Sequence, residues 1–159
     1  MLKATFIALA FSLSFASSAH AQTNGQHVLE SMFYNFDENR DGVITLAEAN
    51  HFIDSTFKEM DMRHSGKITR EAFRSFSFGL ADVAAEQGVT GAYERAKDAV
   101  FDRWDRSHAN ALTLEDYRAG VLGDARVAVG GKETDKDLRM DMAAFMRLRF
   151  VRQLMVSLH

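Results

Sequence analysis

The chain contains no proline in its 159 residues, and this absence is the feature that most constrains its fold. Proline interrupts helices, and apolar residues recur along this chain at the three- and four-residue spacing of one helix face. A clear run is Leu46, Ala49, Phe52, Ile53 and Phe57. Strand-like alternation of polar and apolar residues is hard to find. We therefore predict an all-α fold.

The same spacing places helices along most of the chain. They are expected at about residues 28–36, 46–60, 69–86, 90–104, 113–122 and 141–157. Gly88 should cap the end of the third helix, because glycine adopts the left-handed backbone found there. Thr90 is expected to cap the start of the fourth. Residues 123–136 combine three glycines with charged residues and are predicted to form a linker.

The N-terminus has the composition of an export signal. Lys3 gives a positive start, residues 4–15 form an apolar run, and Ala19 and Ala21 supply a small-x-small cleavage pattern. We predict a signal peptide over residues 1–21, and a periplasmic or secreted bacterial protein after cleavage. The alternative is an amphipathic or anchored N-terminal helix, which the apolar run fits less well because it has no opposing polar face.

Charge and cysteine content narrow the classes of protein further. Without Lys3, one of the 19 basic residues, 18 remain against 22 acidic residues, and the net charge becomes −4 with neutral histidines. Such a chain has no excess of basic residues with which to bind nucleic acid. It also lacks cysteine and therefore disulfides, which fits a bacterial exported protein better than a small eukaryotic secreted module.

One twelve-residue segment, from Asp37 to Glu48, carries oxygen-bearing residues at alternate positions. Ca²⁺ takes about six to eight oxygen ligands, from carboxylates, amides, carbonyls and water. Position 7 contributes a backbone carbonyl, position 9 binds directly or through water, and position 12 supplies both carboxylate oxygens. The predicted metal ligands are Asp37, Asn39, Asp41, Val43, Thr45 and Glu48.

Two further residues complete this loop. Gly42 at position 6 permits the left-handed backbone that turns the chain around the ion. Ile44 at position 8 should face inward and form a short backbone pairing with Ile68, the equivalent residue of the next copy. The alternative is a solvated acidic turn between two helices, which is less favoured because Phe36 and Phe52 also fit the flanks.

A second copy of the pattern covers residues 61–72. It keeps Asp61 at position 1 and Gly66 at position 6, but Arg63 stands at position 3 and Ala72 at position 12. A cation and a missing carboxylate argue against metal binding. We interpret this copy as a structural partner of the first.

Two more copies are weaker still. Residues 105–116 keep acids at both ends, whereas Ala109 leaves position 5 without a ligand and Asn110 replaces the glycine. Weak binding or none is expected. A fourth register over residues 133–144 places Met140 at position 8 and Leu138 at the glycine position. A charged loop leading into the last helix is an equal alternative.

These residues make the chain resemble the EF-hand superfamily over about residues 28–154, if the weaker copies are counted. The resemblance implies helix-loop-helix units and gives the six predicted ligands their family roles. Only residues 49–60 separate the first two loops, so one helix is expected to serve both. This compact spacing is similar to that of bacterial periplasmic EF-hand proteins and, distantly, of lanmodulin. Lanmodulin-like loops have proline at position 2, where this chain has Glu38.

We predict an N-terminal pair of hands over residues 22–88 and a degenerate pair over residues 89–159. No phosphate loop, nucleophile motif or His-Glu-x-x-His pattern occurs, so we expect no enzyme. The predicted function is a calcium sensor or a calcium-stabilised interaction module with one Ca²⁺ site. The alternative is a metal-independent structural or partner-binding helical protein on the same frame.

The last segment, residues 139–159, has four arginines against Asp141 alone. A basic amphipathic helix can contact a protein partner or an anionic membrane surface. An ordinary core helix with a solvated basic face is the alternative that we favour for this segment.

Overall fold

A computed structural model of the protein describes residues 16–131 and 137–159. Most of the predicted signal peptide and the first four positions of the fourth loop lie outside these residues. The predicted cleavage site after Ala21 falls within the first helix, α1. In the described part of the chain, no helix combines the length and apolar character needed to cross a membrane.

The described chain is mostly helical, which confirms the all-α prediction. Its helices are α1 (Ala16–Phe36), α2 (Leu46–Met60), α3 (Arg70–Ser75), α4 (Ala81–Glu86), α5 (Thr90–Trp104), α6 (Leu114–Ala128), α7 (Met142–Phe145) and α8 (Arg149–Val156). The short strands are β1 (Val43–Thr45), β2 (Lys67–Thr69), β3 (Ala111–Thr113) and β4 (Arg139–Asp141). Each strand occupies positions 7 to 9 of one loop copy, and a helix follows it directly. We call the copies loops 1 to 4.

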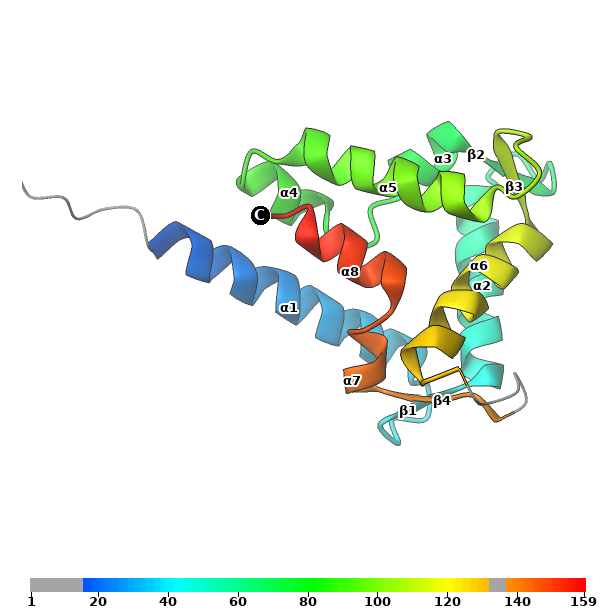
Figure 1. Ribbon diagram of the computed structural model, residues 1–159, viewed down its shortest axis with the longest axis horizontal. Helices are drawn as coiled ribbons and strands as arrows, with labels where there is room; N and C mark the ends of the chain where they lie inside the picture. The colour runs from blue at the N-terminus through cyan, green and yellow to red at the C-terminus, as the bar shows by residue number, and fades with distance from the viewer. Residues whose placement is uncertain (1–15, 132–136) are drawn as a thin grey trace, which may run out of the picture.

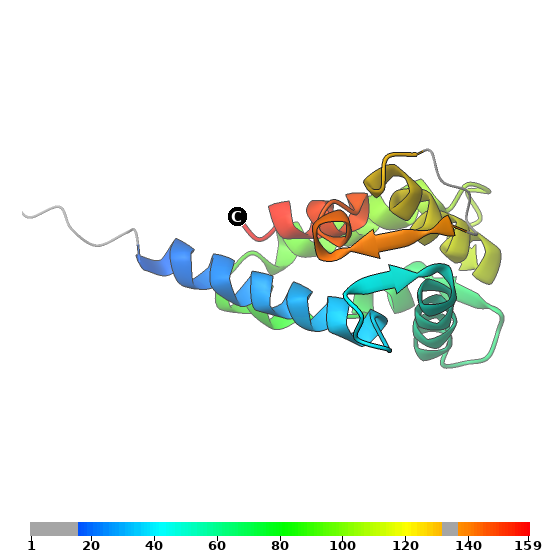
Figure 2. The ribbon, with the colours of Figure 1, turned by 90° about the horizontal axis from the view of Figure 1, so that it is seen from below.

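The strands form two separate antiparallel ladders. β1 pairs with β4, with Ile44 opposite Met140, and Figure 2 shows these two strands side by side. β2 pairs with β3, with Ile68 opposite Leu112. The predicted pairing of Ile44 with Ile68 is therefore wrong. Loops 1 and 2 are joined by α2, a helix of 15 residues and thus about 22 Å long, which places them at its opposite ends.

Helices α2 and α6 pack side by side, with the two ladders at opposite ends of the pair (Figure 1). Between them the hydroxyl oxygens of Thr56 and Tyr117 lie 3.0 Å apart, and Arg118 donates a hydrogen bond to Asp54. Both ladders join the expected N-terminal unit to the expected C-terminal one, and the buried apolar residues form a single cluster. One core therefore supports all four loops.

Several helix boundaries differ from the sequence prediction. The helix expected over residues 69–86 is divided into α3 and α4. α3 is followed by Phe76, whose backbone is extended with a ψ of 124°, and then by Phe78 and Gly79, with φ angles of 48° and 77° that a right-handed helix does not contain. The helix expected over residues 141–157 is likewise divided into α7 and α8. The linker was predicted to begin too early, since α6 continues through Gly123 to Ala128.

The two predicted caps have different outcomes. Gly88 has a φ of 70° just beyond the end of α4, as a C-terminal cap requires. Thr90 is the first residue of α5 and not its cap. Val89 holds the cap position and makes no side-chain hydrogen bond to the helix.

Candidate metal site

Loop 1 (residues 37–48) is fixed to the core at both of its ends and at its strand. Phe36 at the end of α1 stacks on Phe52 of α2, with ring centroids 3.4 Å apart. Ile44 is fully buried and faces Met140 across the ladder. These contacts set the positions of the entering helix, the strand and the exiting helix, and hence of the oxygen atoms between them.

Asp37 closes the first turn of loop 1. The residue is 0% exposed, and its two carboxylate oxygens accept hydrogen bonds from the N–H groups of Asp41 at 3.0 Å and Gly42 at 2.8 Å. Gly42 has a φ of 84°, a conformation that costs glycine little because it has no Cβ. The first acidic residue therefore orders positions 5 and 6 through the backbone.

Positions 3 and 5 are ordered in the same way. The side-chain oxygen of Asn39 accepts the Asp41 N–H at 2.9 Å, and its amide donates to Asp41 Oδ2 at 3.2 Å. Asp41 Oδ1 in turn accepts the N–H of Val43 at 2.9 Å. The side-chain oxygens of positions 1, 3 and 5 thus share one network of loop amides.

Glu48 connects the two ends of the loop. Its Oε2 accepts hydrogen bonds from the N–H and hydroxyl of Thr45, at 2.8 Å and 2.7 Å, and its Oε1 accepts the N–H of Asn39 at 3.4 Å. Thr45 is also the N-cap of α2, so these two residues form a capping box. We did not anticipate this box, although the Thr-x-x-Glu spacing is its sequence signal.

The environment of Glu48 favours the ionised carboxylate. Burial raises the pKa of Glu48, but hydrogen bonds from Thr45, Asn39 and Glu38 together outweigh burial and hold the pKa below its ordinary value. The carboxylate is therefore charged at neutral pH.

The chemistry of the loop 1 donor set fits a hard divalent cation. The six predicted positions offer only oxygen atoms, and three of them, Asp37, Asp41 and Glu48, are carboxylates. In the arrangement described, these carboxylates accept hydrogen bonds from the loop itself. Across residues 16–131 and 137–159, no group of three or more His, Asp or Glu side chains is gathered closely enough to hold a metal. In this arrangement the Glu48 carboxylate is hydrogen-bonded to Thr45 and Asn39.

Loop 2 has the same backbone frame. Asp61 accepts hydrogen bonds from the N–H groups of Ser65 at 2.8 Å and Gly66 at 2.6 Å, and from the Ser65 hydroxyl at 2.9 Å. Burial raises the pKa of Asp61, but these hydrogen bonds and the nearby His64 lower it below its ordinary value. The first turn of loop 2 is thus as well ordered as that of loop 1.

Two of the six metal-ligand positions of loop 2 do not carry a metal ligand. All six positions line one cavity of about 350 Å³. Arg63 places a cation at position 3, and Ala72 has no carboxylate at position 12. The cavity therefore has the loop frame and the oxygens of Asp61, Ser65 and Thr69. It lacks a side-chain oxygen at position 3 and the bidentate carboxylate at position 12.

Loop 3 is closed by its own hydrogen bonds. Asp105 accepts them from the N–H groups of Ala109 at 3.1 Å and Asn110 at 2.7 Å. Asp116 at position 12 accepts the N–H and hydroxyl of Thr113, at 3.1 Å and 2.6 Å, in a capping box like that of loop 1. Position 5 offers no side-chain oxygen, because Ala109 stands there.

Only the second part of loop 4 lies in the described residues. Asp141 at position 9 caps α7 by accepting the Ala144 N–H at 2.7 Å, and Leu138 is buried at the position where loop 1 has glycine. The strand β4 gives loop 1 its pairing partner. Sequence reasoning assigned Met140 to position 8 but did not recognise it as the partner of Ile44.

The comparisons with known proteins agree with the geometry of the first two loops. The family model described as EF hand matches residues 29–50 and 52–77, which include loops 1 and 2 and parts of their flanking helices. Neither the search of curated proteins nor that of solved structures found a significant match. The family match supports a calcium-binding protein in the general sense, of a kind that is typically not an enzyme. The segment of the chain that carries loops 1 and 2 therefore belongs to the EF-hand superfamily.

Proposed function

We propose that the protein is an exported calcium-binding protein with one competent site, loop 1, and that it acts as a calcium sensor or a calcium-stabilised interaction module. The observation that supports this proposal is the set of oxygen ligands in loop 1. Position 12 is Glu48 in loop 1, but Ala72, Asp116 and Ala144 in the other three. Glutamate reaches an ion with both oxygens, and aspartate is shorter.

The residues of loop 1 have distinct parts in holding Ca²⁺. The side chains of Asp37, Asn39, Asp41 and Glu48 would bind it directly, Val43 would bind through its carbonyl, and Thr45 would bind directly or through water. A bound ion supplies positive charge among three carboxylates that repel each other without it. The hydrogen bonds of Asp37 order the turn in advance, which reduces the conformational entropy lost on binding.

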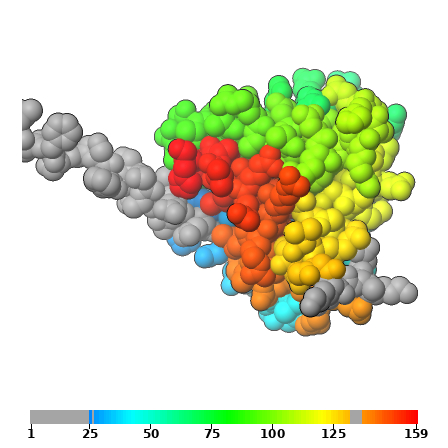
Figure 3. Space-filling view, viewed as in Figure 1, coloured from blue at the N-terminus to red at the C-terminus, as the bar shows by residue number. Residues whose placement is uncertain are grey.

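The apolar residues of the C-terminal segment, among them Phe150 and Leu154, lie in the core, and the partner surface that we propose is the exposed basic face of α8. Arg149 and Arg152 are exposed on α8, and Val156 follows on the same side and is 73% exposed. The C-terminal residues, coloured orange and red, form part of the face seen in Figure 3. An acidic protein partner or an anionic membrane surface would complement this charge. Vesicles with and without anionic lipid, each titrated with calcium and with chelator, separate these two partners.

Export is proposed from the N-terminal sequence, residues 1–21. Fractionation of the source cells, followed by mass determination of the recovered protein, tests it. A chain beginning at Gln22 in the envelope or medium is expected. Intact chain in the cytoplasm would contradict the export proposal without affecting the metal site.

Calorimetric titration of the mature protein with Ca²⁺ tests the site itself. One ion per chain is expected, and Glu48→Gln should remove most of the affinity, because it replaces a bidentate carboxylate. Asp116→Asn is the matched control, since it changes position 12 of loop 3 within the same type of capping box. Binding should be unchanged in this control. Absence of binding heat at millimolar Ca²⁺ would favour the metal-independent structural protein instead.

A further inference from the structure

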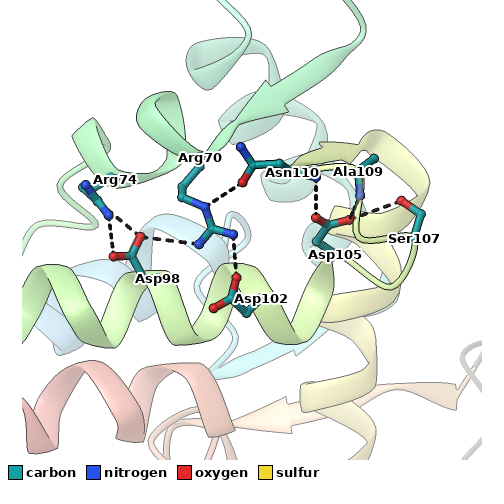
Figure 4. A network of polar contacts seen from close by, with 8 residues as sticks. All are labelled: Arg70, Arg74, Asp98, Asp102, Asp105, Ser107, Ala109 and Asn110. Carbon is teal, nitrogen blue, oxygen red and sulfur yellow. Dashed lines mark hydrogen bonds and ion pairs between the residues drawn. The ribbon is translucent and has the colours of Figure 1, made fainter.

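An arginine side chain bridges loop 2 and loop 3. Arg70, the first residue of α3, donates from Nε to Asn110 Oδ1 at 2.7 Å and from its second terminal nitrogen to Asp102 Oδ1 at 2.5 Å. Its other terminal nitrogen lies 3.7 Å from Asp98 Oδ1, and its guanidinium carbon lies 4.5 Å from the centre of the Phe101 ring. Figure 4 shows this cation between α3, α5 and the turn of loop 3.

The acceptor on loop 3 stands where loop 1 has its glycine. Asn110 has a φ of 54°, and asparagine is among the few residues that tolerate this left-handed conformation. Unlike glycine, it supplies an amide oxygen to Arg70. Position 10, which Arg70 occupies in loop 2, is Leu46 in loop 1 and Leu114 in loop 3. The bridge therefore depends on two residues that depart from the pattern of the competent loop.

Both loops at this end are closed from within as well. Asp61 and Asp105 each accept hydrogen bonds from the N–H groups four and five residues later. Between the loops, Ile68 and Leu112 are paired and fully buried. At this end of the molecule, side chains of the protein thus bind the carboxylates and connect the two loops, as a metal ion could do elsewhere.

We propose that Arg70, with Asn110 and Asp102, forms a latch that holds loop 2 against loop 3 without metal. The β2–β3 end of the α2 and α6 pair is then assembled in advance, and metal binding at loop 1 acts on the opposite end. The latch itself is independent of the proposed calcium site. Only the assignment of the metal-responsive end rests on the proposed function.

Hydrogen exchange of the metal-free protein in chelator tests the latch. Slow exchange is expected for the paired amides of β2 and β3. Arg70→Met, which keeps an apolar stem near Phe101, and Asn110→Gly, which removes the acceptor, should each accelerate this exchange by about fivefold. Asn110→Asp keeps an oxygen acceptor and should stay close to the wild type. The matched control is Arg74→Met, one turn along α3, because Arg74 binds Asp98 but no residue of loop 3.

Two results would overturn the proposal. One is fast exchange of the β2 and β3 amides in the wild-type protein in chelator. The other is an equal effect of Arg70→Met and Arg74→Met. Should Arg70→Met fail to fold, Asn110→Gly decides the question alone, with exchange in α2 and α6 as the measure of intact structure. Calorimetry with Ca²⁺ on the same samples separates a failure of the latch from a failure of the metal site.

Discussion

Replacement of Gly120 by alanine should destabilise the protein, although alanine favours helices. Gly120 lies in α6 against the indole ring of Trp104 on α5. A Cβ atom at this position would lie 2.4 Å from Cγ and 2.5 Å from Cδ1 and Cδ2 of the ring, well inside van der Waals contact. The indole cannot easily move aside, because it packs against the rings of Phe73, Tyr117 and Phe150 at centroid distances of 5.5 to 5.8 Å.

Two opposing free-energy changes set the size of the effect. Overpacking of a dense core costs about 1 to 3 kcal/mol, and contacts this short place Gly120→Ala at the upper end of that range. The higher helix propensity of alanine returns about 1 kcal/mol. We expect a net loss of about 2 kcal/mol in the free energy of unfolding, or a fall of roughly 4 to 8 °C in Tm for a chain of this size.

Urea unfolding followed by Trp fluorescence measures this change, because the chain contains one tryptophan. Gly123→Ala is the matched control, since Gly123 lies one turn later in α6 and has no atom within 4 Å of an added Cβ. This control should gain about 0.5 to 1 kcal/mol. Equal stabilities for the two variants would refute the inferred close approach of α5 and α6.

Three further predictions concern the loops. Arg63→Asp combined with Ala72→Glu should add a second calcium site in loop 2, and an unchanged stoichiometry in calorimetry would contradict the alignment. Because the pKa of folded Asp61 lies below its unfolded value of about 3.9, its ionised form stabilises the fold above that pH. This contribution is lost as the pH falls through the folded pKa, so Asp61→Asn should flatten the acid limb of a stability curve measured in chelator. Calcium should slow hydrogen exchange in β1 and β4 more than in β2 and β3, and equal changes in both ladders would show that the effect is not local.

The local features of the fold could be predicted from sequence because their causes lie within a few residues. The turn of loop 1 needs only Gly42 and the oxygens around it, and Asp37 reaches the amides of that same turn. The family match and the geometry agree on this segment. In the same way, Gly88 ends α4 through its own backbone conformation.

The features that escaped prediction depend on contacts between distant segments. The break between α3 and α4 places Phe78 at a positive φ that few bulky residues adopt. Burial of its ring, whose centroid lies 6.4 Å from that of Phe150 in α8, compensates for it. Spacing along the chain carries no signal for such a compensation. The sequence also led to two predictions that are incompatible: that Ile44 pairs with Ile68, and that one helix serves both loops. Loops at opposite ends of one helix cannot form a strand pair with each other.

The pairing of the loops follows from the two shared helices. α2 begins at loop 1 and ends at loop 2, and α6 begins at loop 3 and ends at Ala128, ahead of loop 4 in the chain. When these helices pack antiparallel, the start of α2 meets the end of α6, which brings loop 1 beside loop 4 and loop 2 beside loop 3. Towards the β2–β3 end of the pair, the hydroxyl oxygens of Thr56 in α2 and Tyr117 in α6 lie 3.0 Å apart and connect the two helices. An ion in loop 1 would therefore act first on the β1–β4 end, and its effect would reach the other ladder only through the length of two packed helices.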